Sequence, residues 1–166
     1  MIKLLLSFFV IFISINGLAQ LIPQVRRIDS LVARIETSQS TKIIGVREVN
    51  DDPLYIPDRY VLDSTKKKLL KVIHKKILEE NPFYYKDTAT SDYYFLDSSL
   101  IKVAQIIKKC SDSSLLSKNY YFENSKIIYK AGQLNGKEFI LEEEDIVTSF
   151  MERAARYISF FKSFPK

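Results

Sequence analysis

The sequence predicts an α+β fold in which helices pack on an antiparallel sheet. Three observations predict it: an aromatic hairpin pattern that occurs twice, an Asn135-Gly136 dipeptide typical of a tight turn, and apolar stripes at helical spacing in the N-terminal and C-terminal parts of the chain. With 166 residues and a hydrophobic fraction of 46%, the chain has the size and composition of a single globular domain.

The repeated pattern has the features of two β-hairpins. Tyr-Tyr-Phe occurs at residues 93–95 and again at 120–122, and each copy is followed by a polar pair, Asp97-Ser98 or Asn124-Ser125, and then by aliphatic residues. Asp and Asn tolerate positive φ, so these polar pairs are the predicted two-residue turns. The expected cross-strand pairs are Phe95 with Leu100, Tyr94 with Ile101, Phe122 with Ile127, Tyr121 with Ile128, and Glu123 with Lys126.

Side chains alternate between the two faces of a strand, so each predicted hairpin presents apolar groups on both faces. An antiparallel sheet commonly has one apolar face and one solvated face. The second face therefore needs a cover, which is either a helix of this chain or an external ligand or partner. In the second case four residues form a candidate binding face: Tyr94, Ile101, Tyr121 and Ile128.

Further strands extend the predicted sheet. Residues 92–141 are expected to form a meander of five antiparallel strands, with Asn135-Gly136 as a type I′ turn. Residues 99–109 fit either a helix or a strand, and their equivalence to the second hairpin favours a strand. Residues 42–49 and 60–63 are predicted as earlier strands.

Three helices are predicted around this sheet. The first spans residues 21–37, and the last begins at residues 142–145 and carries an apolar stripe from Ile146 to Phe161 that is expected to pack on the sheet. The middle helix spans residues 65–80 and is rich in lysine. Its lysines include Lys67, Lys71 and Lys75, which lie about one helical turn apart and form a candidate face for anionic surfaces. Such a face either keeps the protein soluble or docks on an anionic membrane or polysaccharide.

The N-terminus has the pattern of a secretory signal peptide. Lys3 precedes an apolar run at residues 4–15, and small residues follow, so cleavage is expected between Ala19 and Gln20. The predicted organisation is a cleaved signal peptide, residues 1–19, and a single α+β domain, residues 20–166. The run is shorter than the ~20 residues of a membrane span, so no integral span is expected in the mature chain. No cysteine stands directly after the run, so a lipoprotein anchor is not expected. The chain is poor in cysteine, which favours a periplasmic or secreted bacterial protein.

The residues that carry common catalytic chemistry are scarce. His74 is the only histidine and Cys110 the only cysteine, so the sequence predicts neither a zinc site nor a catalytic triad, and no cofactor is expected. A net charge of +5 is too small to indicate a dedicated nucleic-acid-binding protein.

These observations favour an exported, non-enzymatic binding module of a bacterial cell envelope, with a protein or a glycan as its partner. Two alternatives remain open at this point. One is an envelope-surface protein that docks on an anionic polymer or membrane through the lysine-rich helix. The other is a small enzyme with a pocket between a helix and the sheet, in which His74 would take part.

Overall fold

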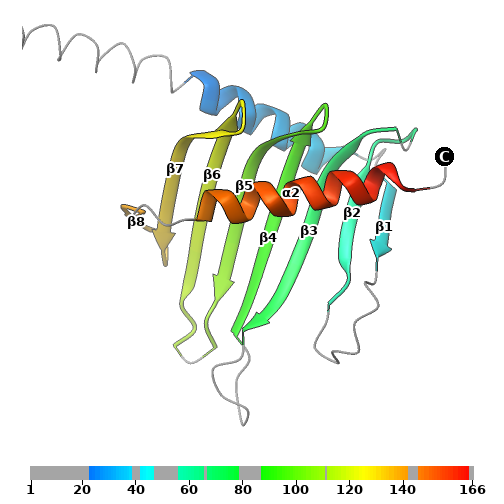
Figure 1. Ribbon diagram of the computed structural model, residues 1–166. Helices are drawn as coiled ribbons and strands as arrows, with labels where there is room; N and C mark the ends of the chain where they lie inside the picture. Colours follow the sequence, from blue (N-terminus) through cyan, green and yellow to red (C-terminus); the bar gives the residue numbers. More distant parts are fainter. Residues whose placement is uncertain are drawn as a thin grey trace, which may run out of the picture.

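A computed structural model describes residues 23–38, 42–46, 56–65, 67–78, 87–110, 112–141 and 146–164 of the chain. Within these ranges the chain forms one sheet with a helix on each face (Figure 1). The predicted α+β class with an antiparallel sheet is confirmed. The predicted signal peptide and its cleavage site at Ala19 and Gln20 lie outside the described residues.

Eight strands form the sheet in the order in which they occur in the sequence, and each pairs antiparallel with the next. The predicted meander of five strands corresponds to β4–β8, and β1–β3 enlarge the sheet beyond it. The strands are β1 (Lys42–Val46), β2 (Asp58–Leu62), β3 (Leu69–Leu78), β4 (Asp87–Leu96), β5 (Ser99–Lys108), β6 (Leu115–Glu123), β7 (Lys126–Leu134) and β8 (Lys137–Phe139).

The two helices cross the strands on opposite faces of the sheet. Helix α2 (Ile146–Lys162) lies in front of the sheet in Figure 1, and the N-terminal helix, residues 23–37, lies behind it. Both helices lie nearer to the end of the sheet that carries the β4–β5 and β6–β7 turns, so the lower ends of the strands extend beyond them. Among the described helices, none is long and apolar enough to cross a membrane.

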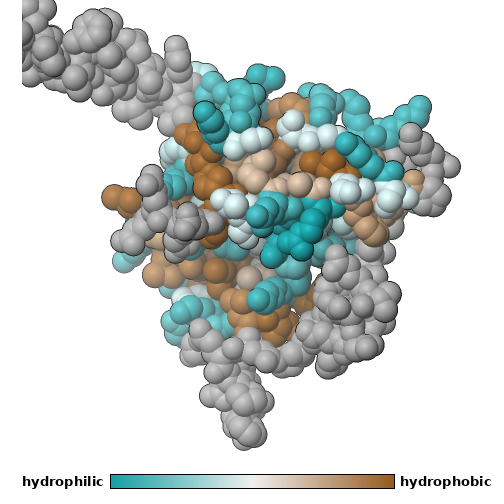
Figure 2. Space-filling model, viewed as in Figure 1, coloured by the Kyte–Doolittle hydropathy of each residue, from teal (hydrophilic) through white to brown (hydrophobic). Residues whose placement is uncertain are grey.

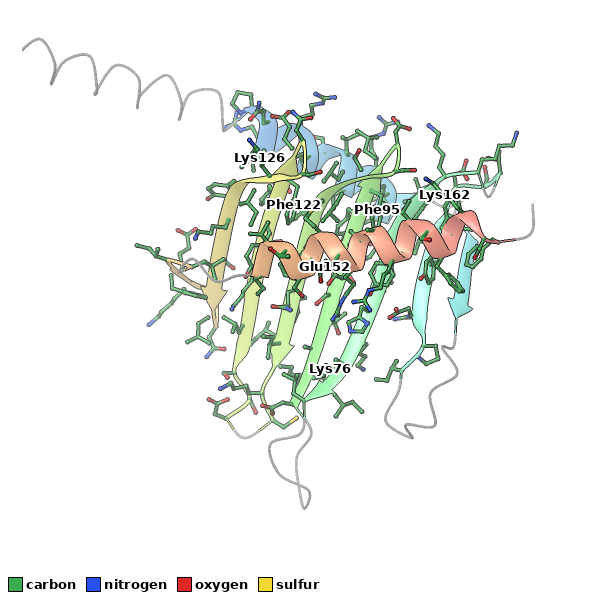
Figure 3. All side chains as sticks on the ribbon, in the orientation of Figure 1. Lys76, Phe95, Phe122, Lys126, Glu152 and Lys162 are labelled. Carbon is green, nitrogen blue, oxygen red and sulfur yellow. The ribbon has the colours of Figure 1, made fainter. Side chains whose placement is uncertain are left out.

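The larger core lies between the sheet and α2. Phe95 of β4 and Phe122 of β6 occupy equivalent positions in the two hairpins, are each 1% exposed and belong to this core; both are labelled in Figure 3. Phe150, Ala154 and Tyr157 of α2 are buried against this face, as the apolar stripe of the last predicted helix requires.

Both predicted hairpin turns are confirmed, with one correction to the pairing beside them. Asp97, Ser98, Asn124 and Ser125 all have positive φ, between 47° and 64°, which a type I′ turn needs. The pairs of Phe95 with Leu100, Phe122 with Ile127 and Glu123 with Lys126 are as expected.

Tyr94, however, lies opposite Lys102, and Tyr121 lies opposite Tyr129. A register shift after each of these tyrosines indicates a β-bulge, in which two residues of one strand oppose one residue of its neighbour. The bulge leaves Ile101 and Ile128 on the same face as Tyr94 and Tyr121, so the predicted division into two faces holds although the pairing differs.

The prediction of a lysine-rich middle helix is wrong, because residues 69–78 form strand β3 in the interior of the sheet. Val72 is fully buried on the α2 side, whereas Lys71 contacts the other helix, which is the alternation of a strand. The apolar residues at 69, 70, 73, 77 and 78 fit a helical stripe, but β3 has neighbours on both sides and both faces, and pairing with β2 and β4 overrides local helix propensity.

Strands β2 and β3 repeat the hairpin geometry a third time. Tyr60 lies opposite Val72, just as Tyr93 lies opposite Val103, and the register shifts between Val61 and Leu62 at the position equivalent to the two bulges. A longer connection, residues 63–68, replaces the two-residue turn, so this copy is hidden when the sequence is searched for the aromatic pattern alone.

Candidate functional site

The N-terminal helix covers the candidate binding face. Tyr94, Ile101 and Tyr121 are 5%, 8% and 6% exposed, and Ile128 is half-buried. Ile28 of the helix is buried among them, and further apolar side chains of the helix pack around it: Val25, Leu31, Val32 and Ile35. The face is therefore an interface between helix and sheet within this chain. The sequence left open whether a helix of this chain or an external partner covers the face, and the structure shows the helix.

Glu36 of the N-terminal helix binds a polar pair on this face. Lys71 and Tyr94 lie opposite each other on β3 and β4, and both donate hydrogen bonds of 2.7 Å to Glu36 Oε1. Lys71 Nζ also lies 2.7 Å from Asp92 Oδ2 and 5.0 Å from the centroid of the Tyr94 ring. Burial alone would raise the pKa of Glu36, but the hydrogen bonds from Lys71 and Tyr94 outweigh burial and lower it. Burial, followed by the hydrogen bond to Glu36, raises the pKa of Tyr94.

Asp29 binds an equivalent pair one copy further along the sheet. Lys102 of β5 lies opposite Tyr121 of β6, and the two donate hydrogen bonds of 2.7 and 3.0 Å to Asp29 Oδ1. Lys102 Nζ lies 4.7 Å from the centroid of the Tyr121 ring. Burial, followed by the Asp29 charge, raises the pKa of Tyr121. The two contacts together fix the helix on the sheet.

The lysines of the candidate anionic-surface face do not share a surface. Lys71 is 6% exposed and is engaged by Glu36 and Asp92, whereas Lys75 is exposed further along β3 and Lys67 is exposed before the strand begins. The predicted face needs helical spacing, and the residues lie on and beside a strand. Docking on an anionic surface through that face is therefore not supported by the arrangement of these side chains.

His74 belongs to a polar row on the α2 face. Its Nδ1 lies 2.8 Å from Asp58 Oδ1 of β2, and it lies opposite Ser91 of β4, whose Oγ accepts a 3.2 Å hydrogen bond from Gln105 of β5. The row joins an acid, a histidine and a serine, but Ser91 is 4% exposed and its hydroxyl is engaged. A nucleophilic serine must be reached by its substrate, so this row has the geometry of two partly buried polar pairs, Asp58 with His74 and Ser91 with Gln105.

No metal centre is indicated in the described part of the chain, where no three His, Cys, Asp or Glu side chains group closely enough to hold an ion. Cys110 is half-buried, and its backbone N–H donates a 2.8 Å hydrogen bond to Asp87 Oδ1. That contact ties the end of β5 to the start of β4 and gives the segment around Cys110 a structural role.

An apolar surface remains at the end of the sheet that the helices leave uncovered. Five of the eight large hydrophobic side chains that are exposed in the described residues lie there, on or beside β5–β8. We call these five residues the distal patch: Ile106, Leu115, Leu134, Phe139 and Ile140. Figure 2 shows hydrophobic surface below α2 and at the side where β8 lies.

The strand pairing divides the distal patch between the two faces of the sheet: Leu134 and Phe139 lie on the α2 face, whereas Ile106 and Leu115 lie on the face of the N-terminal helix. On the α2 face, Ile107, Leu116 and Leu134 lie opposite one another across β5, β6 and β7, and Phe139 of β8 packs its ring over Gly132. A Cβ added at Gly132 would lie 2.6 Å from that ring, so glycine is what allows Phe139 to lie flat on β7. The α2-face part of the distal patch, Leu134 and Phe139, therefore continues a row of half-buried aliphatic side chains on β5 and β6.

Lysines border the distal patch. Lys137 lies opposite Leu134, and Lys108 lies opposite Leu115. Lys76 lies at the same end of the sheet, on the α2 face (Figure 3). The combination of apolar centre and basic border suits a protein surface with the opposite charge at its own border.

Comparisons of this chain with family models, with curated proteins and with solved structures gave no match.

The distal patch has no clear signal in the sequence. Four of its residues fall in predicted strands, Leu115 falls in a predicted polar loop that the structure shows as the start of β6, and period-two alternation alone does not show which end of a strand a helix will cover. One weak signal is present in the sequence: β5 and β6 carry apolar residues at their far ends on both faces, at 106, 107, 115 and 116. A helix that runs across the strands covers only the part of each strand that lies beneath it, so the far ends of the strands stay uncovered.

Proposed function

We propose that this chain is an exported, non-enzymatic binding module and that a protein partner docks on the distal patch. The observation that supports this proposal is that exposed apolar side chains gather on β5–β8: Leu134 at the end of β7 is 48% exposed, and Ile140, which follows β8 at the edge of the sheet, is 90% exposed. Soluble monomers rarely expose large contiguous apolar surface, and such surfaces commonly mark interaction sites.

The border of the patch indicates the chemistry of the partner. Lys108, Lys118 and Lys137 lie on the patch strands, where they outnumber the acidic residues Glu138 of β8 and Asp112 in the β5–β6 connection. A partner surface with an apolar centre and acidic residues around it would gain both apolar burial and favourable long-range attraction. A second copy of this chain would bring lysines against lysines, so we propose a different protein.

The N-terminal sequence supports export. Lys3, the apolar run at residues 4–15 and the small residues before Gln20 are the features that the secretion machinery recognises. We therefore place the binding event in the bacterial periplasm or outside the cell.

Site-specific crosslinking tests the proposal. A photoreactive amino acid at Ile140 is expected to give a discrete heterologous adduct when the protein is expressed in its own cells, because this side chain is almost fully exposed in the patch. The matched position is Leu96, which is exposed to 38% at the other end of the sheet and should give no such adduct. Leu134→Asp should abolish the adduct at position 140.

Two results would oppose the proposal. The same adducts from positions 140 and 96 would show that crosslinking reports only exposure. Adducts of this chain with itself, formed in the purified protein, would show that the patch is the interface of a homo-oligomer.

A further inference from the structure

A groove lies at the end of the molecule opposite to the distal patch. It is enclosed by the N-terminal helix and by the tips of the β4–β5 and β6–β7 hairpins, and its volume is about 260 Å³. Each hairpin tip is one copy of the sequence repeat, so equivalent turns form two of the three walls. The groove shares no lining residue with the distal patch.

The floor of the groove is apolar and well ordered by packing. Ile28 of the helix and Ile101 of β5 are each 8% exposed, and Leu31 lies one helical turn beyond Ile28. Ile101 is on this side of the sheet only because the β-bulge places it beside Tyr94. A floor of aliphatic side chains can contact the C–H face of a small ligand.

The rim of the groove offers every kind of hydrogen-bonding group. Arg27 only donates, the carboxylates of Asp97 and Glu123 only accept, and the Asn124 amide does both. Glu123 Oε2 accepts a 3.1 Å hydrogen bond from Gln24, which leaves its other oxygen for a ligand. Such a rim suits a molecule whose own groups both donate and accept, which is the property of vicinal hydroxyls.

Charges of both signs are interspersed around the groove, and Lys126 lies opposite Glu123. Asp97 Oδ1 lies 3.0 Å from Lys68 Nζ, so this carboxylate already has a cation beside it. Arg27 and Lys68 are positive, Asp97 and Glu123 are negative, and all four are exposed to solvent. A charged ligand would therefore gain little from long-range electrostatic attraction to this site. The binding of a neutral ligand does not depend on such attraction.

We propose that this groove binds a neutral carbohydrate, as a pyranose ring or the end of a short glycan. The ring lies with its C–H face on the aliphatic floor and its hydroxyls directed to the rim. The hydroxyls donate to Asp97 and Glu123 and accept from Arg27 and Asn124. No covalent step is involved.

The test is a titration of the exported form of the chain, purified from the periplasm, with neutral trisaccharides of glucose, N-acetylglucosamine and mannose. Binding is followed by calorimetry and by the methyl resonances of Leu31 and Ile101, which line the floor. We expect at least one neutral trisaccharide to bind and to shift these resonances. Oligogalacturonate and deacetylated chitotriose serve as anionic and cationic probes and should bind more weakly.

Matched variants locate the binding. Arg27→Gln and Asn124→Gly should each weaken it about tenfold or more, because each removes a hydrogen-bonding group from the rim. Arg26→Gln alters the adjacent arginine, and Ser98→Gly alters a turn residue that, like Asn124, has positive φ, but neither side chain lines the groove. Glycine is at ease at positive φ, so both turn variants retain the hairpin, and neither control should change affinity.

Three outcomes would overturn the proposal. The first is the absence of any methyl shift with all neutral probes at millimolar concentration. The second is equal or tighter binding of a charged probe. The third is equal weakening by Arg26→Gln and Ser98→Gly, which would place the ligand elsewhere.

Discussion

Asp29 and Glu36 lie two turns apart on the N-terminal helix and bind equivalent lysines of two hairpin copies, Lys102 and Lys71. Seven helical residues rise about 10.5 Å. The two lysine–tyrosine pairs are two strands apart, which amounts to about 9.6 Å. Because these lengths agree, a helix that runs across the strands can place both carboxylates over equivalent positions of the repeat.

The two lysines should differ in their contribution to stability. Lys71→Met leaves Asp92 without its cation, and Asp92 Oδ1 is buried with no hydrogen-bond partner in the described residues. The loss of one partner from a buried ion pair costs about 3–5 kcal/mol. Lys102→Met leaves Asp29, whose side chain is 46% exposed and can be solvated, so about 1 kcal/mol is expected. Urea denaturation of the two variants measures the difference.

A third variant separates the buried charge from lost packing. Asp92→Asn combined with Lys71→Met removes the unpaired charge and should recover part of the loss. If Lys71→Met and Lys102→Met are equally destabilising, Asp92 is not the reason for the cost.

Acid should weaken the attachment of the N-terminal helix. The pKa of Glu36 is lowered in the folded protein from its ordinary 4.5, so the stability that it contributes is present above about pH 4.5 and is lost as the pH falls through the folded pKa. Glu36→Gln keeps a hydrogen-bond acceptor but removes this pH dependence. Protection of the helix amides against hydrogen exchange, relative to the intrinsic rate at each pH, should therefore fall between pH 5 and pH 3 in the parent and change less in the variant. Equal acid sensitivity of both proteins would rule out Glu36 as the titrating group.

Alkali should weaken the packing of both helices on the sheet, because buried tyrosines lie under each of them. Burial raises the pKa of Tyr93 to about 12 from its ordinary 10.0, and it raises the pKa of Tyr94, Tyr121 and Tyr157 still further. A raised folded pKa means that the contribution to stability is complete below pH 10 and is lost as the pH rises towards the folded value. Tyrosinate absorbance of these four rings should appear together with the loss of β-sheet circular dichroism. A smooth titration of all ten tyrosines near pH 10 in the folded protein would contradict this expectation.

The sequence allowed the repeated hairpins, their turns and both terminal helices to be predicted, because each has a local signal. The turn residues Asp97 and Asn124 tolerate positive φ, and the apolar stripe around Phe150 has helical spacing. The bulges could not be predicted in this way, because a register shift depends on how the neighbouring strands pack. Lys102 therefore takes the place opposite Tyr94 that was expected for Ile101.

Strand β3 shows why a local pattern can mislead. Its apolar residues satisfy helical and strand spacing equally, and its lysines favour a helix. What decides is the pairing of Lys71 with Tyr94 and of Val72 with Tyr93, which joins β3 to a strand that begins beyond residue 86. The cover of the candidate binding face likewise depends on contacts between residues far apart in the sequence. Nothing in the hairpin sequences themselves indicates that Ile28 packs on Tyr94 and Tyr121.

The hidden third copy of the repeat makes a prediction about the core. Leu62 of β2 is equivalent to Phe95 and Phe122 and is 1% exposed. Leu100 of the first hairpin is the leucine with which we compare it, because it is also buried, with 5% of its surface exposed. Leu62→Ala and Leu100→Ala should therefore be similarly destabilising, by about 2–5 kcal/mol, because each removes a side chain from the same core under α2. Leu96→Ala, at an exposed position beside the turn, is the matched surface change and should stay within about 0.5 kcal/mol of the parent. Chemical denaturation measures all three, and a cost for Leu62→Ala as small as that of Leu96→Ala would mean that β2 is an attached edge strand and not a copy of the repeat that shares the core.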